Sequence, residues 1–478
     1  MKRYAAVTIG PIGDTMALAL TPVSLWASSY LFSHLAKTLC RVLTEHGVPE
    51  QNIITPYYRH DEPLLERQDG VGLFHDRIVF ELGEFPIERF DAVRRIAVAE
   101  VAAAFDLDPN YLLGYLRVEA AVFEADNPVA EGNILLDSFE LARPFVTEEA
   151  LNPFDVLFGG SSTSRNTNLR RTSVVSGLKE FQLRAADGTF KALGDIASTG
   201  SGSLRFNYYA IVHADGDGMH RVVEQLTSDD DIRRFSRTCL EYCAAVAALV
   251  AQYDGITVYS SGDDLLAILP CESREGKTPL HFSQEASVLY DRFFGGYKPH
   301  TTLSFGVAVA YHRQHLQEVL SRSAELLFTV AKRGGKNRFA LDILSYTATF
   351  GIDVESRFVC TNGVVGNLLL LMERMRSLGE RGRPIYGMAS KRLRERAALF
   401  NGAEGEELYR VLQNEFSFLS DGYGLSVAEL FTDVLQQIKH SGEPRALDGV
   451  TELDDPALTL SYLLRMCQFF IGKGGDAE

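Results

Sequence analysis

Two adjacent aspartates, Asp263 and Asp264, occupy the tip of what the sequence pattern predicts to be a β-hairpin. The surrounding stretch Val258–Pro270, VYSSGDDLLAILP, has apolar runs on both sides of the pair. Such runs around a short glycine-containing turn are typical of two paired strands. Because like charges repel, the pair is either a solvated surface turn or a site that holds a cation. The stretch alone leaves both interpretations open.

A second set of acids precedes the hairpin by 48 residues, in the stretch HADGDGM. Asp215 is expected at the end of an apolar strand, and Asp217 is expected to open the following turn. Gly216 and Gly218 let the backbone approach a ligand, and the helix that begins near Met219 offers N–H groups to a phosphate. An acid beside a phosphate is repulsive unless a cation such as Mg²⁺ or Mn²⁺ lies between them.

If the two predicted strands lie side by side, Asp215, Asp263 and Asp264 converge. Two divalent ions held about 3.5–4 Å apart by such carboxylates can activate an attacking hydroxyl and stabilise a leaving group. The alternatives are a surface turn or a calcium loop, but DGDGMHRVVEQL departs from the EF-hand pattern at its fifth and twelfth positions. The combination favours a two-metal site for phosphoryl transfer.

Two further pairs of residues are weaker candidates for a functional site. Lys332 and Lys336, in AKRGGKNRFALDIL, can meet a triphosphate or can simply favour a helix C-terminus. Cys239 and Cys243 lie one helical turn apart, but no CxxC or HxxxH partner accompanies them. We therefore interpret the two cysteines as core residues and not as metal ligands.

The elements that must position these residues fall into four predicted segments. Residues 1–136 alternate strand and helix patterns, and residues 205–350 follow the order βα, α, ββ, α, β, α, β, which suits a ferredoxin-like or palm sheet. Residues 137–204 are rich in Gly, Ser, Thr and Asn, and we expect an insertion or linker. Residues 351–478 are expected to be helical, with no strand after about Cys360.

The N-terminal stretch VTIGPIGDTM is a weak echo of IVHADGDGMH, because both combine a strand, a glycine-containing turn and a helix start. Only the second stretch carries acids at the strand end. The chain is therefore predicted to hold two related palms, the first of them degenerate.

Composition narrows the functional classes. The 478 residues are enough for a globular protein of several domains. The net charge of -16 disfavours a function as a free-standing protein that binds nucleic acid without sequence preference, because such binding depends on positive charge. No run of eighteen apolar residues and no signal peptide is present, and the six cysteines are scattered. We expect a soluble cytoplasmic protein without membrane contact.

Four stretches, YYAIVHADGDGM, VYSSGDDLLAILP, TLSFGVAVAY and AKRGGKNRFAL, resemble in order and spacing the palm of the large subunit of type III CRISPR effector complexes. TIGPIGDTM and LWASSYLFSHL resemble that family's first palm, in particular its Cmr branch. The resemblance covers roughly residues 1–120 and 205–345. It implies an α+β fold, with two ferredoxin-like palm domains plus a C-terminal helical domain.

The family further implies two ATP molecules held between the palms and 3′–5′ phosphodiester formation at the second palm. Target RNA switches this reaction on, and the other complex subunits and a guide RNA are partners. The resemblance implies metal ligands at Asp215, Asp263 and Asp264 for two ions, Mg²⁺ or Mn²⁺. It implies nucleotide-binding roles for the remaining candidates, which are Gly216, Asp217, Gly218, Met219, Ser261, Gly262, Lys332, Lys336, Ser28 and Ser29.

Three departures from the family pattern shape the expectations. Ser261 stands where the family's Gly-Gly-Asp-Asp turn has its first Gly, which costs about 1 kcal/mol if the position needs a positive φ. The dipeptides His60-Asp61 and His75-Asp76 are interpreted as coincidental, so no HD nuclease is expected. Residues 137–203 contain no cysteine, so zinc is not expected.

Two alternatives belong to other functional classes. A diguanylate-cyclase-like enzyme shares the palm, but it prefers an acid followed by Glu-Phe after the two glycines, where this chain has Asp264-Leu265. A non-catalytic scaffold subunit fits the acidic composition and the helical C-terminal segment. The product, whether a cyclic oligoadenylate or AMP joined to another metabolite, is not specified by the metal site.

Overall fold

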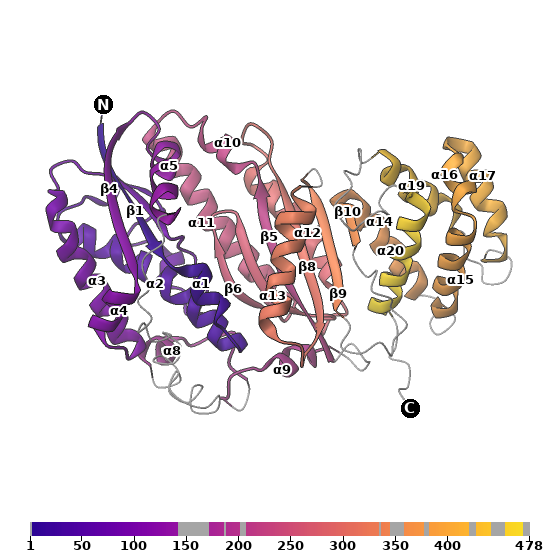
Figure 1. Ribbon diagram of the computed structural model, residues 1–478, viewed down its shortest axis with the longest axis horizontal. Coiled ribbons are helices and arrows are strands. Elements are labelled where there is room, and N and C mark those ends of the chain that lie inside the picture. The colour runs from indigo at the N-terminus through magenta and orange to yellow at the C-terminus, as the bar shows by residue number, and fades with distance from the viewer. Residues whose placement is uncertain are drawn as a thin grey trace.

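A computed structural model describes the fold of most of the chain. The described residues are 2–141, 172–185, 188–200, 207–333, 336–344, 358–376, 382–419, 427–440 and 455–471. Much of the predicted insertion at 137–204 lies outside them, as do the predicted boundaries at 204/205 and 350/351. Figure 1 shows two sheets next to each other, followed by a group of helices at the far end of the chain.

The first sheet has the strand order β2-β3-β1-β4. Its described pairs are antiparallel, and β1 lies between β3 and β4. This is the order of a ferredoxin-like βαββαβ unit. Its elements are β1 (Lys2–Gly10), α1 (Ile12–Ala17), α2 (Pro22–Glu45), β2 (Ile53–Thr55), β3 (Arg77–Glu81), α3 (Phe90–Phe105), α4 (Pro109–Tyr115), β4 (Arg117–Ala125) and α5 (Pro128–Leu141).

The second sheet repeats this order in its β8-β5-β7-β6 part and adds β9 and β10 beside β8. The two sheets therefore share one topology, and the predicted fold of two ferredoxin-like palms is confirmed. The elements are β5 (Tyr208–Asp217), α10 (Met219–Val223), α11 (Asp229–Gln252), β6 (Ile256–Ser261), β7 (Asp264–Pro270), α12 (Pro279–Phe294), β8 (Thr302–Tyr311), α13 (Leu316–Glu325), a π-helical turn (Leu326–Ala331), β9 (Arg338–Leu344) and β10 (Phe358–Thr361).

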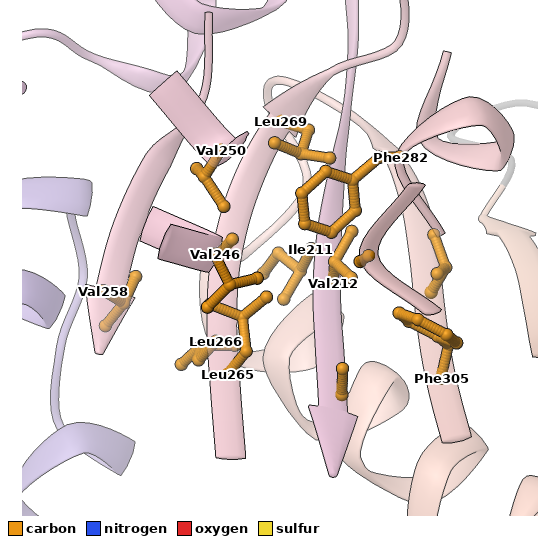
Figure 2. Packing of buried hydrophobic residues seen from close by; sticks show 14 of the residues in the cluster. Ile211, Val212, Val246, Val250, Val258, Leu265, Leu266, Leu269, Phe282 and Phe305 are labelled. Atoms are coloured by element: carbon orange, nitrogen blue, oxygen red, sulfur yellow. The ribbon is translucent and has the colours of Figure 1, made fainter. Parts of the chain in front are cut away.

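Alternation along β5 directs its side chains to two different layers. His213 hydrogen-bonds with Ser323 of α13, whereas a Cβ on Gly216 would meet Tyr290 of α12. Since successive strand residues point to opposite faces, α12 and α13 lie on opposite faces of the sheet. Figure 2 shows the apolar packing of the second palm, with Val246 of α11 near the strand residue Leu266. Burial of such side chains stabilises the strands that carry the acids.

Helices make up most of the described C-terminal part, as predicted. They are α14 (Asn362–Arg376), α15 (Gly382–Glu395), α16 (Ala397–Gly402), α17 (Gly405–Glu415), α19 (Ala428–His440) and α20 (Pro456–Ile471). One strand departs from the expectation, because β10 lies within the segment predicted as helical and pairs with β9. Two short helices, α8 (Ser173–Gly177) and α9 (Leu193–Ala197), occur in the predicted insertion, and α5 extends into it. None of the described helices has the length and apolar character that a bilayer span requires.

Candidate metal and nucleotide site

Three carboxylates meet where β5 ends and the β6–β7 hairpin turns. Asp215 lies near the end of β5, and Ala214 pairs with Leu265 of β7, so the next residues along, Asp215 and Asp264, end up close together. Gly262 has a φ of +66° and makes the tight turn that brings Asp263 to the same place. One carboxylate oxygen from each of the three aspartates lies within 4.8 Å of the other two. Two distant stretches of sequence thus form one acidic cluster.

Burial disfavours the ionised form of the carboxyl groups in this cluster. Burial raises the pKa of the Asp263 carboxyl well above its usual range, and the neighbouring Asp264 raises it further. Burial also raises the pKa of Asp264 to about 7. A group of carboxylates that resists ionisation becomes favourable to ionise when a cation binds against it.

Lys332 supplies one positive charge to the cluster. Its ammonium forms an ion pair with the Asp215 carboxylate and donates a 2.9 Å hydrogen bond to the carbonyl of Gly216. Burial, aided by the nearby Lys336, lowers the pKa of Lys332 to about 8. A single ammonium offsets only part of the charge of three carboxylates, so the cluster has capacity for a further cation.

The donor set and the space around it fit a hard divalent ion. Carboxylate oxygens are the ligands that Mg²⁺ and Mn²⁺ prefer. A Cβ built on Gly216 would lie 2.4 Å from Asp263 Oδ2 and 2.6 Å from the Tyr290 hydroxyl, so only glycine fits beside the cluster. Neither the Tyr290 hydroxyl nor the buried Thr301 hydroxyl has a hydrogen-bond partner of normal geometry among the described residues. Sequence reasoning missed Tyr290, because it lies 74 residues after Gly216 in an ordinary amphipathic helix.

The Asp217 carboxylate is hydrogen-bonded within the protein itself. Its buried carboxylate accepts hydrogen bonds from the hydroxyls of Thr302 (2.7 Å) and Ser304 (2.8 Å) and from the backbone N–H of Asn337 (2.8 Å). These bonds fix the end of β5 to β8 and to the segment that follows Lys332. Asp217 therefore positions the backbone around the cluster, and it lies 3.9 Å from the Lys332 ammonium.

Ser261 is accommodated without backbone strain. It ends β6 and pairs with Asp264, and the positive φ in this turn belongs to Gly262. The energetic cost considered for a serine at this place therefore does not arise. Behind the hairpin, Cys243 Sγ donates a 3.5 Å hydrogen bond to the carbonyl of Gly262, consistent with a packing role for this cysteine.

Two cavities lie between the palms and meet at the acidic cluster. The first has a volume of about 550 Å³ and is lined by Met219, Gly262 and Asp263 among others. The second has a volume of about 450 Å³, and its lining includes Ser29. Both volumes fall in the range of small-molecule sites. The linings share four residues, which are His75 and Asp76 from the first palm and Ser261 and Asp264 from the second.

The remaining candidates lie on α2 and in the turns that follow β5 and Lys332. Ser28 is buried in α2, and its hydroxyl donates to the carbonyl of Leu25, whereas the next residue, Ser29, lines the second cavity. Lys336 has a φ of +66° and lies in the turn after Lys332. Gly218 also has a positive φ, +78°, and caps α10 at its N-terminus.

The two His-Asp dipeptides lie in different surroundings. His60 is exposed and contacts Glu50 through Nδ1. His75 uses both ring nitrogens, one with the Thr55 hydroxyl and the other as acceptor from the backbone N–H of Arg77. Among the described residues, neither histidine belongs to a group of side chains that could jointly hold a metal.

Comparison with known proteins gives the same assignment for both palms. Residues 208–340 match the family model described as Cas10/Cmr2, second palm domain, and residues 4–103 match that of the CRISPR-associated protein Cmr2, N-terminal. The Cmr subunit Cmr2 of Pyrococcus furiosus is 23% identical over 175 residues, which cover 31% of this chain and 20% of the relative. The match thus spans a fifth of that relative's length.

Solved structures with the same fold include Csm1 proteins. Csm1 of T. onnurineus has a TM-score of 0.59 at 13% identity, and the match covers 98% of this chain and 70% of that one. Csm1–Csm4 cassettes in complex with cA4 and with AMPPNP have TM-scores of 0.58 and 0.57 at 12% identity, with the same coverage. At these identities the likeness concerns the fold. The two family matches thus identify residues 208–340 as a Cas10/Cmr2 second palm domain and residues 4–103 as a Cmr2-type N-terminal region, and both support a chain like the Cas10 large subunits of type III CRISPR effector complexes.

Proposed function

We propose that this chain is a metal-dependent nucleotidyltransferase that joins ATP molecules into a cyclic oligoadenylate or a related AMP-containing second messenger. The observation that carries the proposal is the meeting of Asp215, Asp263 and Asp264 at the junction of two nucleotide-sized cavities. The relatives solved with AMPPNP, pppApA and cA4 support ATP as the substrate and linked adenylates as products.

In this proposal the two cavities hold two nucleotides between the palms, and the three aspartates hold Mg²⁺ or Mn²⁺, with two ions expected. When bound, the ions supply charge neutralisation for the triphosphate and activation of the attacking hydroxyl. The turn at Gly216–Met219 contributes backbone N–H groups beside the phosphates. Lys332 is held between the carbonyl of Gly216 and the Asp215 carboxylate, and its ammonium would offset negative charge on a phosphate bound beside this turn.

We further propose that the reaction takes place inside a cytoplasmic type III complex and starts when guide RNA pairs with target RNA. The solved Csm1–Csm4 subcomplex of a type III-A interference complex supports partner subunits of this kind. The domain division that we propose remains 1–136, 137–204, 205–350 and 351–478, with β10 joined to the second palm sheet.

The test uses the complex assembled with guide RNA and supplied with target RNA, ATP and Mg²⁺ or Mn²⁺. We expect AMP-containing products with the unaltered chain and a loss of at least about 100-fold in rate with the Asp263→Ala, Asp264→Ala double variant, because both ligands leave the cluster. Mass spectrometry identifies the product. Asp61→Ala is the matched control, since Asp61 is an exposed acid away from the cluster.

Each alternative function gives a distinct result in the same assay. Product formed from GTP but not from ATP would favour the diguanylate-cyclase-like function. A complex that binds guide and target RNA but converts no nucleotide would favour the scaffold. Unchanged product from the double variant would overturn the metal-site assignment.

A further inference from the structure

The two palms align residue by residue through their first strand and the two helices that follow it. When Thr8 of β1 is aligned with Asp215 of β5, α1 and α10 begin at matching residues, and so do α2 and α11, which are both 24 residues long. The faces of the sheets agree as well. The Thr8 hydroxyl bonds to α5, the helix after the fourth strand, and His213, two residues before Asp215, bonds to the corresponding helix α13. Thr8 pairs with Arg77 of β3, so Arg77 holds the place that Asp264 has beside Asp215.

The charges at these matching places are reversed. The second palm carries two acids on its paired strands and a cation, Lys332, after α13. The first palm carries the cation Arg77 on its strand and the acid Glu140 in the last turn of α5. The Arg77 guanidinium donates to both carboxylate oxygens of Glu140, at 3.0 and 2.7 Å, and the Thr8 hydroxyl donates to the same carboxylate at 3.0 Å. The first palm therefore holds an internal ion pair where the second holds its acidic cluster.

The Arg77 guanidinium binds α5 over two turns of the helix. Besides Glu140, it donates to Asp137 Oδ1 at 2.6 Å and to Asn133 Oδ1 at 3.2 Å. The apolar packing of α5 is sparse, because only three of its residues are buried, and one of them is Gly132, which has no side chain. Forked contacts of an arginine with carboxylates are among the stronger polar interactions. The attachment of α5 to the sheet therefore depends on Arg77.

The other end of α5 is attached to the second palm. The side-chain amide of Asn127, just before the helix, donates to the carbonyl of Val223 at 2.7 Å and to that of Leu226 at 3.2 Å, at and just after the end of α10. The helix thus bridges the palms, with its start on the second and its last turns on the first.

Between these two attachments, α5 faces the first cavity. Residues at helical spacing on one side of α5 line this cavity, and they are Ala130, Asn133, Ile134 and Asp137. The side chain of Ile134 is 70% exposed, so an apolar group is available for contact with a ligand. Met219, Gly262 and Asp263 of the second palm line the same cavity. A ligand in this cavity would therefore meet both α5 and the turns beside the acidic cluster.

We propose that α5 is the wall of the first cavity that contacts the bound nucleotide, and that Arg77 is the positioning residue that holds this wall in place. The inference rests on the proposed function and adds a helix of the first palm to the nucleotide site. Residues of the second palm form the acidic cluster, so displacement of α5 should weaken nucleotide binding without removing a metal ligand. Loss of a contact that is equal in the bound state and in the transition state raises KM and leaves kcat unaltered.

The test measures initial rates against ATP concentration in the RNA-activated complex for the unaltered chain, Arg77→Gln and Arg77→Lys. We expect Arg77→Gln to raise KM for ATP by about fivefold or more, while kcat changes by less than about twofold. Arg77→Lys keeps the charge but not the forked donor, so its KM should lie between the other two. Arg95→Gln is the matched control, because Arg95 is an exposed arginine of the same palm that pairs with Asp91 on α3, and its KM should be unaltered.

Hydrogen exchange provides a readout that does not depend on catalysis. AMPPNP with Mn²⁺ should slow the exchange of the α5 amides in the complex of the unaltered chain, and should slow it less in Arg77→Gln. Melting temperature and Mn²⁺ binding should be nearly the same in both, because the substitution changes neither the apolar core nor the acidic cluster.

The possible failures have different meanings. If Arg77→Gln leaves KM unaltered while the Asp263→Ala, Asp264→Ala variant is inactive, the role of Arg77 is overturned and the proposed function stands. If kcat, melting temperature and Mn²⁺ binding fall together, Arg77 is a general structural residue and the inference is wrong. If the unaltered complex makes no product from any nucleotide, the proposed function is overturned. Hydrogen exchange then decides the inference, which fails if AMPPNP does not protect α5.

Discussion

At the scale of single residues, Gly216 provides the most direct test of the site's geometry. An alanine there would place its Cβ 2.4 Å from Asp263 Oδ2 and 2.6 Å from the Tyr290 hydroxyl, so Asp263 must move. We expect Gly216→Ala to lower the nucleotidyltransferase rate by at least about 100-fold, because ligand geometry is lost, and to cost about 1–3 kcal/mol of stability. Initial rates and thermal unfolding in the presence and absence of Mn²⁺ measure both effects.

The first palm supplies the control for this substitution. Gly10 ends β1, the strand that corresponds to β5, and a Cβ on Gly10 would meet no atom within 4 Å. Gly10→Ala should therefore leave rate and melting temperature nearly unchanged. Equal effects of the two substitutions would show that the close approach at Gly216 is not specific to the acidic cluster.

The site residues that were predicted best from the sequence are those that stand next to a clear apolar strand pattern. Asp263 and Asp264 lie between two apolar runs, and Asp215 ends a third, so their meeting followed from strand pairing alone. The bonds of Asp217 could not be predicted in this way, because its partners Thr302 and Asn337 lie 85 and 120 residues away. The local sequence around a hydroxyl or a backbone amide does not indicate which distant residue will accept its hydrogen bond.

At the scale of elements, hydrophobic periodicity located most strands and helices, because long apolar runs specify them locally. The hairpin formed by β6 and β7 occupies the predicted stretch Val258–Pro270 to within two residues, and the second palm has the predicted order of strands and helices. The four-residue strand β10 (Phe358–Thr361) has no such run of its own and is defined by its pairing with β9. Short edge strands of this kind depend on the sheet that they join.

The junction of β5 with α13 gives the molecule a predictable sensitivity to acid. His213 is buried in β5 and hydrogen-bonds through Nδ1 with the Ser323 hydroxyl at 2.8 Å. Burial lowers its pKa from 6.5 to about 4, so between these values the unfolded chain binds the proton more tightly than the folded one does. Its contribution to stability is therefore full above about pH 6.5 and is lost as the pH falls to about 4, by at most about 3 kcal/mol.

This sensitivity is measured as the change in melting temperature between pH 7.5 and pH 5. His213→Gln should show a smaller change than the unaltered chain, because its amide does not titrate. The half-buried His34 and His75, whose pKa values desolvation also lowers to about 4, should account for part of the remainder. His60→Gln, a substitution of an exposed histidine, is the control. If His213→Gln shows the same change in melting temperature as the unaltered chain, His213 does not contribute to the loss of stability in acid.

At the scale of the whole molecule, the two palms contact each other in a reciprocal way. Helix α2 of the first palm contacts β6 of the second, and α11 of the second contacts β2 of the first. Because α2 and α11 hold the same place in the shared topology, as do β2 and β6, the palms are related by an approximate two-fold arrangement. This arrangement places Asp76 and Asp264 on opposite sides of one boundary between the cavities. The activity that we propose thus depends on how the palms are held together as well as on the acids of the second palm.

Asp229, at the start of α11, is the residue that tests this dependence away from the cavities. Its carboxylate accepts hydrogen bonds from the Tyr4 hydroxyl at 3.0 Å and from the Lys2 ammonium at 2.8 Å, both on β1 of the first palm. Asp229→Ala would leave the Tyr4 hydroxyl in a largely buried position without its acceptor, at a cost of about 1–3 kcal/mol. We expect the nucleotidyltransferase rate to fall several-fold and hydrogen exchange to accelerate in β2 and α11, while Mn²⁺ binding by the acidic cluster is retained.

The neighbouring acid makes the comparison specific to the contact between the palms. Asp230 is exposed, and among the described residues its carboxylate forms an ion pair only with Arg233 one turn further along the same helix, so Asp230→Ala removes an equal charge without touching the first palm. If both variants lose rate equally, the loss reflects the charge at the start of α11. If only Asp229→Ala loses rate while Mn²⁺ binding persists in both, the spacing of the palms limits catalysis, because the two nucleotides must approach within bonding distance across that boundary.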